Sequence, residues 1–360
     1  MWRSFTNRVL TCSRFSPCTF PKILNEDGMI SVATSPQLAV FAAPVCLLCG
    51  STKLKTESEH DQKRLQKCLH CGVLFVMPQP SPDALANHFQ VGGLVTIDDF
   101  ETQFEVNRQP VLSQVVNYIR SRKDSGTILD VGCATGFFLA GLTKTSKWDP
   151  WGVELSLPAA EEARRSGIQV QVGDTRSAKF KDHSFDVITV LDAFYYFPNP
   201  ESELGELGRI LKQDGFLALE LPWAHTRVWQ RAAIIGKLLN GTRIPLLQSS
   251  DHLFYYTPTS VSRLLEQCGF TVQTIRPLPA NQQASGLREF LWRTYSLFSR
   301  LLWRLSASKI FLGPRFLVVA GKGAPSPRGG AKGQRSGHEQ CQTLVPAAAS
   351  AQPIAMRKTH

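Results

Sequence analysis

The stretch that decides the fold is TILDVGCATG, residues 127–136 of this 360-residue chain. It begins as a short apolar strand, and Gly132 and Gly136 then bracket a tight turn before a helix that we expect near Phe137. Glycine in such a turn lets backbone N–H groups approach a ligand closely, and the N-terminus of the following helix adds a partial positive charge. The stretch therefore predicts a strand, turn and helix that together bind a cofactor.

The spacing of the glycines distinguishes two kinds of cofactor. A dinucleotide-binding turn has the order G-x-G-x-x-G, whereas this chain has D-x-G-x-x-x-G from Asp130 to Gly136. An acid before the first glycine and the longer interval between the glycines favour S-adenosylmethionine (SAM) over NAD. The next strand ends in Glu154, 22 residues after Gly132, and a carboxylate at the end of that strand can accept both ribose hydroxyl protons.

Outward from this turn, apolar strands alternate with amphipathic helices. Such alternation yields a mostly parallel sheet that helices cover on both faces, an α/β fold. A helix at about 108–122 precedes the first strand. The strands expected after the first are 151–155, 169–172, 185–191, 216–221 and, near the end of the chain, 315–320.

In this order the elements resemble the successive motifs of class I SAM-dependent methyltransferases. The resemblance implies a Rossmann-like, seven-stranded sheet, SAM as cofactor and methyl transfer as activity. It also implies an acid near the adenine amino group, here in Gly173-Asp174 after the third strand. The cofactor-binding residues expected on these grounds are Asp130, Gly132, Cys133, Gly136, Glu154, Asp174 and Asp192.

Four of the nine cysteines form two identical C-x-x-C-G knuckles, separated by 18 residues. Two residues between thiolates let one turn place both sulfurs on one ion, and two such turns complete the tetrahedral shell that Zn²⁺ prefers. Because protein atoms fill all four positions, the zinc would be structural. A redox-active C-x-x-C would leave the second pair unexplained. The expected zinc ligands are Cys46, Cys49, Cys68 and Cys71.

Residues 46–270 resemble a bacterial group of methyltransferases with an N-terminal zinc ribbon, several of which act in sugar, glycan or secondary-metabolite pathways. The shared features are the Pro-rich exit at 78–82, Pro222 after the fifth strand, and the segment 251–258 before a helix. The resemblance implies a small-molecule, sugar or glycan/lipid-linked acceptor. Where this group has a Glu-His pair after the fourth strand, the chain has Tyr195-Tyr196, so a histidine base at that place is not carried over.

A catalytic base is needed only for some acceptors, because the methyl group of SAM is already electrophilic. For a hydroxyl or acidic carbon the candidates are His252, His225 and Asp192, each expected at or over a strand's C-terminal end. The resemblance favours His252. The alternative is a histidine that only caps the helix expected from Thr257.

Two other functions remain open. The net charge of +11 and the zinc module would suit an RNA methyltransferase that uses the ribbon as an anchor. Against this, the chain lacks an N-P-P-[YF] tetrad after the fourth strand, and acids balance the lysines of the knuckle region. The second alternative is a non-enzymatic SAM-binding or interaction protein, which the complete set of cofactor motifs disfavours.

The expected organisation has five parts. They are a disordered leader or mis-called start at 1–42, the zinc ribbon at 43–82, a helical linker at 83–125, the methyltransferase domain at 126–321 with insertions at 223–250 and 286–314, and a disordered basic tail at 322–360. The tail holds six basic residues and one acid. No apolar run approaches the roughly 18 residues of a spanning helix.

The expected location is cytoplasmic and of bacterial type, with peripheral membrane contact through residues 287–304. That stretch mixes Trp, Phe and Leu with periodic Arg, as an interfacial helix does, although a helix packed on the domain with a basic edge would have the same composition. The sequence leaves the methyl acceptor and the oligomeric state open.

Overall fold

The computed structural model describes residues 45–60, 63–81, 84–85, 106–144, 147–223, 252–279, 287–306 and 313–323. All of them belong to one compact unit, Pro44–His360. The expected leader at 1–42, most of the insertion at 223–250 with His225, and nearly all of the tail at 322–360 lie outside the described residues.

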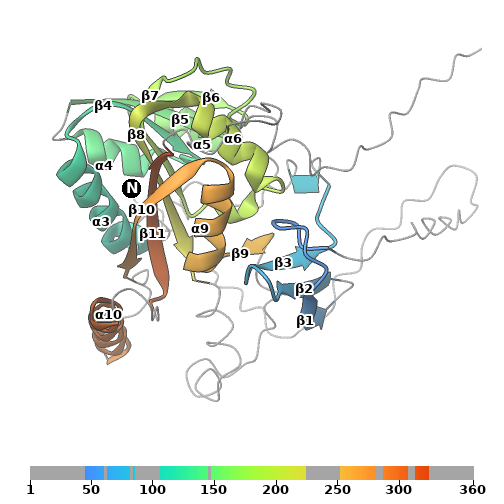
Figure 1. Ribbon diagram of the computed structural model, residues 1–360. Coiled ribbons are helices and arrows are strands. Elements are labelled where there is room, and N and C mark those ends of the chain that lie inside the picture. The colour runs from blue at the N-terminus through green and yellow to red at the C-terminus, as the bar shows by residue number, and fades with distance from the viewer. Residues whose placement is uncertain are drawn as a thin grey trace, which may run out of the picture. The chain divides into compact units, whose positions relative to one another are not determined.

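A seven-stranded sheet forms the centre of the fold (Figure 1). Strands β8, β7, β4, β5 and β6 are parallel neighbours, and β11 and β10 add antiparallel pairs at one side, which confirms the predicted mostly parallel sheet. Every residue of the central strand β7 is buried, as expected of a strand with helices on both faces. In spatial order the strands are β10 (Phe270–Leu278), β11 (Arg315–Lys322), β8 (Leu211–Pro222), β7 (Phe185–Leu191), β4 (Ser125–Val131), β5 (Lys147–Glu154) and β6 (Gln169–Val172).

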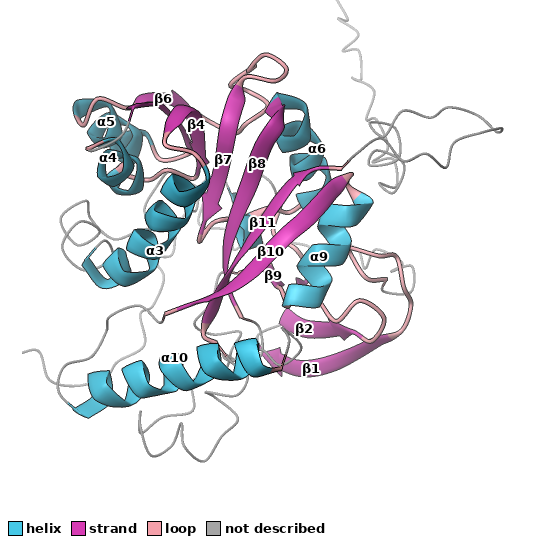
Figure 2. Cartoon of the chain, turned by 60° about the vertical axis from the view of Figure 1, so that its left-hand side comes forward, coloured by secondary structure: helices cyan, strands magenta, loops and turns pink. Residues whose placement is uncertain are grey.

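Helices cover both faces of this sheet (Figure 2). On one face, α3 (Val106–Arg122), α4 (Phe137–Thr143) and α5 (Leu157–Arg165) share one hydrophobic core. On the other face, α6 (Pro200–Ile210) and α9 (Pro258–Gln267) pack into a second core. Burial of these helix faces therefore positions the loops that follow the parallel strands.

Two strands begin earlier than the sequence predicted. Strand β5 begins at Lys147 rather than at 151, and β8 begins at Leu211 rather than at 216. Leu211 is fully buried and pairs with Phe185, and a register irregularity after Phe185 accommodates the residues up to Phe216. Burial of the leucine side chain thus extends the strand beyond the turn signal.

A second, four-stranded sheet contains the cysteine module but is not made by it alone. Its order is β1 (Leu54–His60), β2 (Lys63–Cys68), β3 (Leu74–Met77) and β9 (Phe254–Tyr255). Strand β9 belongs to the segment just before α9, so more than 170 residues of chain separate it from its partner β3. Cysteines of the module and residues of β7 and β8 share one hydrophobic core.

Further contacts fix the module to the rest of the unit. Arg263 of α9 donates a hydrogen bond from Nη1 to the carbonyl of His70, 2.8 Å away. The amide of Val76 donates to the carbonyl of Leu253 at 3.0 Å, and the amide of Leu253 donates to the carbonyl of Tyr195 at 3.1 Å. The segment around Leu253 thus connects the module with the end of β7. None of the described helices is long and apolar enough to cross a membrane.

Candidate functional site

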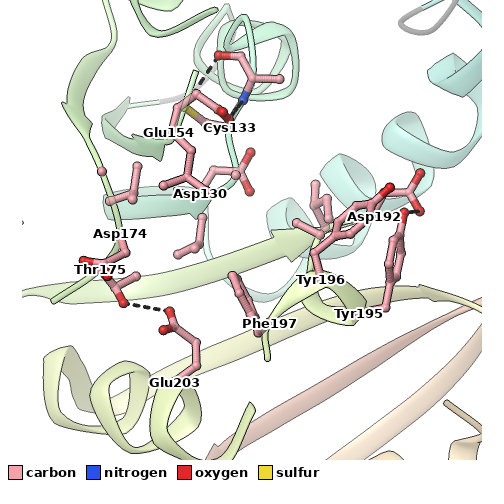
Figure 3. Close-up of a pocket in the computed structure, with 18 of the residues that line it drawn as sticks. Asp130, Cys133, Glu154, Asp174, Thr175, Asp192, Tyr195, Tyr196, Phe197 and Glu203 are labelled. Carbon is pink, nitrogen blue, oxygen red and sulfur yellow. Dashed lines mark hydrogen bonds between the residues drawn. The ribbon is translucent and has the colours of Figure 1, made fainter. Parts of the chain in front are cut away.

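A cavity of about 590 Å³ opens where the parallel strands β4, β5, β6 and β7 end, within the size range of small-molecule sites. Figure 3 shows its polar residues in groups: Asp130, Cys133 and Glu154 in one, Asp174, Thr175 and Glu203 in another, and Asp192 with Tyr195 and Tyr196 in a third. Open α/β sheets bind ligands at this edge. Each cofactor-binding residue expected from the sequence, apart from Gly136, lines the cavity.

The turn after β4 has the backbone geometry that its glycines predicted. Gly132 and Gly136 have φ of 75° and 79°, a conformation that side chains disfavour. A Cβ on Gly132 would lie 2.9 Å from the Cβ of Ala193, and one on Gly136 would lie 2.3 Å from Cδ1 of Ile168. Gly136, which has no side chain, therefore allows α4 to approach α5 on the side of the turn away from the cavity, while Gly132 lines the cavity.

Glu154 ends β5 beside this turn. Its Oε2 accepts a hydrogen bond from the amide of Ala134 and its Oε1 accepts one from the amide of Ser156, each at 2.9 Å. Burial raises the pKa of this carboxyl group. A carboxylate has about four lone-pair positions, so each oxygen retains the capacity for one more donor, such as a ribose hydroxyl. The two backbone bonds hold it in position for that role.

Asp130 is buried at the end of β4, where Thr189 donates a hydrogen bond from Oγ1 to its Oδ1 at 2.6 Å. Desolvation raises the pKa of Asp130 to about 8, although Thr189 and the charge of Arg108 lower it. The group is therefore only partly ionised at neutral pH, and a cation placed beside it would favour its ionised form.

The far end of the cavity holds a carboxylate that the sequence analysis missed. Glu203 of α6 is half-buried and accepts a hydrogen bond from Oγ1 of Thr175 at 2.7 Å, and desolvation raises its pKa to about 7. The expected adenine ligand Asp174 is exposed, and its Oδ1 accepts from the amide of Ser177 at 2.7 Å. From sequence, Glu203 looks like an ordinary acid in the first turn of a helix, so no signal distinguished it.

Four charged side chains form a buried network beside the cavity: Arg108, Asp192, Glu220 and Arg315. Arg108 donates from Nη2 to Glu220 at 2.5 Å and lies 3.5 Å from Asp192, and Arg315 bonds to both acids. Two guanidinium groups thus balance two carboxylates. The arginines come from α3 and β11, far apart in the chain, and only the folded sheet brings them together.

This network changes the interpretation of Asp192. Burial disfavours its ionised form, but Arg315 and Arg108 outweigh that effect and hold the pKa of Asp192 well below its usual range. A carboxylate held so firmly ionised is a weak base. The hydroxyl of Tyr195 donates to its Oδ1 at 2.7 Å. A role of Asp192 as a base stays a prediction, and its low pKa disfavours proton abstraction.

His252 is buried behind the two tyrosines. Its ring centroid lies 3.7 Å from that of Tyr195 and 5.5 Å from that of Tyr196. Both tyrosines line the cavity, whereas His252 does not. It does not cap α9 either, because Thr257 and Ser260 form the capping box of that helix. A direct role for His252 as a base stays a prediction, and the geometry favours an effect through Tyr195.

The four cysteine sulfurs of the knuckles converge. The Sγ atoms of Cys46 and Cys71 are 3.7 Å apart, those of Cys49 and Cys68 are 3.6 Å apart, and all four lie within 4.8 Å of one another. Zn–S bonds of about 2.3 Å in a tetrahedron require sulfurs about 3.8 Å apart, whereas a disulfide requires about 2.05 Å. The donor set and its spacing therefore fit a zinc ion and not two disulfides.

Comparison with curated proteins gives matches to methyltransferases. Residues 104–275 match a family described as a methyltransferase domain. "Probable tRNA methyltransferase 9B" of Mus musculus is 28% identical over 114 residues, which are 31% of this chain and 25% of the mouse protein. Ubiquinone biosynthesis O-methyltransferase of Neisseria meningitidis is 21% identical over 184 residues, 48% of this chain and 74% of that protein. The match thus spans about a quarter of the mouse protein's length.

Solved structures that align with this chain include one bacterial and one archaeal protein. YcgJ of Bacillus subtilis aligns with a TM-score of 0.39 at 16% identity and covers 60% of this chain and 99% of its own. A SAM-dependent methyltransferase of Archaeoglobus fulgidus aligns with a TM-score of 0.38 at 17% identity and covers 61% of this chain and 98% of its own.

Proposed function

Because residues 104–275 match a methyltransferase domain and surround a cavity at the ends of the parallel strands, we propose that the chain transfers the methyl group of SAM to a small-molecule, sugar or glycan/lipid-linked acceptor. The observation that carries the proposal is the placement of Glu154, which two backbone amides hold at the rim of a cavity that the glycine turn also lines. Two relatives are named ubiquinone biosynthesis O-methyltransferase and malonyl-[acyl-carrier protein] O-methyltransferase, and these names support an acceptor other than nucleic acid.

Each group of residues then has a part in holding SAM. Glu154 would bind the ribose hydroxyls, and Asp130 would face the ammonium of the amino-acid end. Arg108, which the sequence analysis missed as a cavity residue, lines the cavity and would supply positive charge to the amino-acid carboxylate. Asp174 and Glu203 would face the adenine end. Bound SAM supplies a methyl group that its sulfonium makes electrophilic.

Methyl transfer also requires that the protein align the acceptor with the methyl group and exclude water. Tyr195 and Tyr196 line the cavity beyond β7, and the bond from Tyr195 to Asp192 fixes one of the two rings. Burial raises the pKa of Tyr195 well above its ordinary value, so its hydroxyl stays protonated and acts as a donor or wall rather than as a base. The proposal therefore requires no general base among these residues.

The cysteine cluster completes the proposal with one structural zinc ion bound by Cys46, Cys49, Cys68 and Cys71. Because these cysteines share a core with β7 and β8, the ion would stabilise the layer that carries the acceptor side of the cavity.

An RNA acceptor is the second candidate, and it is favoured by the mouse relative's name, probable tRNA methyltransferase 9B. Exposed Lys53, Lys55 and Lys63 of the module would contact phosphates, but Glu57 and Glu59 lie between Lys55 and Lys63 on the same hairpin. A salt-sensitive gel shift with transfer RNA would support this candidate, and no shift at low salt would remove it.

The test is calorimetric titration of the full chain with SAM and with its demethylated product. Replacing Glu154 by Ala removes two acceptors for ribose hydroxyls and should weaken SAM binding on the order of 10- to 100-fold. Glu161→Ala, which changes an exposed acid of α5, is the matched control and should bind SAM as wild type does. No heat with either compound, or equal affinity in both variants, would refute the proposal. Binding without turnover would instead support the non-enzymatic alternative.

A further inference from the structure

Helix α10 (Leu287–Leu305) packs on the domain through its less apolar side. Among its residues from Thr294 onward, the buried ones are Ser296, Ser299 and Trp303. These positions are three and four residues apart, so they form one face of the helix. Trp303 belongs to the core that α6 and α9 also share.

The outward side of α10 is strongly apolar. Leu297, Phe298, Leu301 and Leu305 are 64%, 56%, 55% and 76% exposed. They are four of the ten exposed large apolar side chains in the described part of the chain, and helical spacing places them together on the side opposite Ser296, Ser299 and Trp303. A helix that serves only to cover a core has the reverse arrangement, with its apolar face inward. The exposed stripe therefore indicates a second contact surface.

Charge indicates what covers this stripe. The sequence of α10 contains four arginines and one glutamate, and the chain as a whole carries +11. Arg304 is exposed and Arg300 is half-buried one turn before it, and helical spacing places both along one edge of the stripe. A second copy of this chain would bring like charges together, which disfavours self-association at this face. An apolar stripe with a basic edge suits the boundary between acyl chains and anionic headgroups.

We propose that α10 docks the protein on an anionic lipid bilayer, with Leu297, Phe298, Leu301 and Leu305 in the acyl boundary and the arginines at the headgroups. The helix lies in the boundary plane and does not span it. Methyl transfer is not required for this docking, so the inference stands apart from the proposed acceptor.

The position of α10 gives the docking a consequence for the cavity. The helix lies beyond one end of the sheet, close to the end of β10 and the start of β11 (Figures 1 and 2). At the start of β11, the carbonyl of Pro314 accepts a hydrogen bond from the amide of Trp223, and Arg315 bonds to Asp192 beside the cavity. A bilayer under α10 therefore lies on the same side of the sheet as the cavity, and an acceptor in the membrane would approach from there.

The experiment is co-sedimentation of the full chain with vesicles of equimolar phosphatidylcholine and phosphatidylglycerol, compared with phosphatidylcholine alone. Wild type should bind the anionic vesicles at low salt and lose most of that binding at high salt. The double variant Leu301→Ser/Leu305→Ser should bind at least tenfold more weakly. Leu157→Ser, which changes a leucine of α5 that is 51% exposed, is the matched control and should bind as wild type does.

Three results would overturn the proposal: no binding of wild type to anionic vesicles at low salt, equal binding by the double variant, or equal loss in the Leu157→Ser control. Light scattering tests whether a second copy of the chain covers α10 instead. If wild type is a dimer that does not bind vesicles, and the double variant is a monomer, the membrane proposal is overturned. Circular dichroism and SAM titration establish that the variants are folded. If wild type does not bind SAM, that result counts against the proposed function and not against membrane docking.

Discussion

The buried carboxyl of Asp130 makes a specific prediction about stability and pH. Its pKa rises from an ordinary 3.8 to about 8 in the folded state. Between these two values the folded protein holds one proton more than the unfolded chain does, so raising the pH favours unfolding. The contribution of Asp130 to the free energy of unfolding therefore falls as the pH rises from its unfolded pKa toward its folded pKa, by about 1.4 kcal/mol per pH unit.

From these two pKa values, the free energy of unfolding should fall by about 2 kcal/mol between pH 6 and pH 8 because of Asp130 alone. Asn at this position has the same shape, and its Oδ1 can still accept the hydrogen bond from Thr189. Asp130→Asn should therefore remove this part of the pH dependence. Glu203→Gln is the comparison, because a folded pKa of about 7 predicts a smaller contribution of about 1 kcal/mol over the same range.

The assay is urea unfolding of the ligand-free chain at pH 6, 7 and 8, followed by tryptophan fluorescence. Contributions from groups other than the substituted one cancel in the difference between wild type and a variant. If wild type and Asp130→Asn lose the same stability from pH 6 to pH 8, the raised pKa of Asp130 is refuted. If Glu203→Gln changes the pH dependence of stability more than Asp130→Asn does, the order of the two pKa values is contradicted.

Three other changes give independent predictions. Gly136→Ala should lower the midpoint of thermal unfolding more than Gly167→Ala does. Both glycines have positive φ, but only a Cβ at 136 would clash, at 2.3 Å from Ile168. Equal midpoints for the two variants would show that the clash relaxes. Asp192→Asn leaves the buried guanidinium groups undercompensated and should cost about 3–5 kcal/mol in urea unfolding, whereas a loss under 1 kcal/mol would mean that the network contributes little. Cys68→Ser should abolish zinc in atomic absorption and lower the midpoint of the whole unit, and full zinc content in this variant would exclude the cluster as the site.

Much of the fold was predictable because its signals are local. The strand ends at Asp130, Glu154 and Asp174, and the glycine turn, depend on residues close together in the chain, and the structure brings these residues to one edge of the sheet. The spacing of the cysteines likewise predicted a cluster that the sulfur distances fit.

The remainder depended on contacts between distant segments. Arg108 and Arg315 meet Glu220 across 112 and 95 residues of sequence, and neither arginine has a local pattern that marks it as buried. His252 was expected near the substrate, but the ring of Tyr195 lies against it, and that packing depends on how the segment before α9 crosses the end of β7. Sequence periodicity predicted α10 as a helix, but which of its sides faces outward needed the folded structure.

The pairing of β3 with β9 limits how this protein can be divided. Anyone who expresses residues 106–323 alone, to obtain a smaller catalytic fragment, would leave β9 as a bare edge and expose Phe254 and Tyr256, both now fully enclosed. The cysteine-containing segment is thus not a detachable accessory, and fragments or fusions of this protein should keep both segments in one polypeptide.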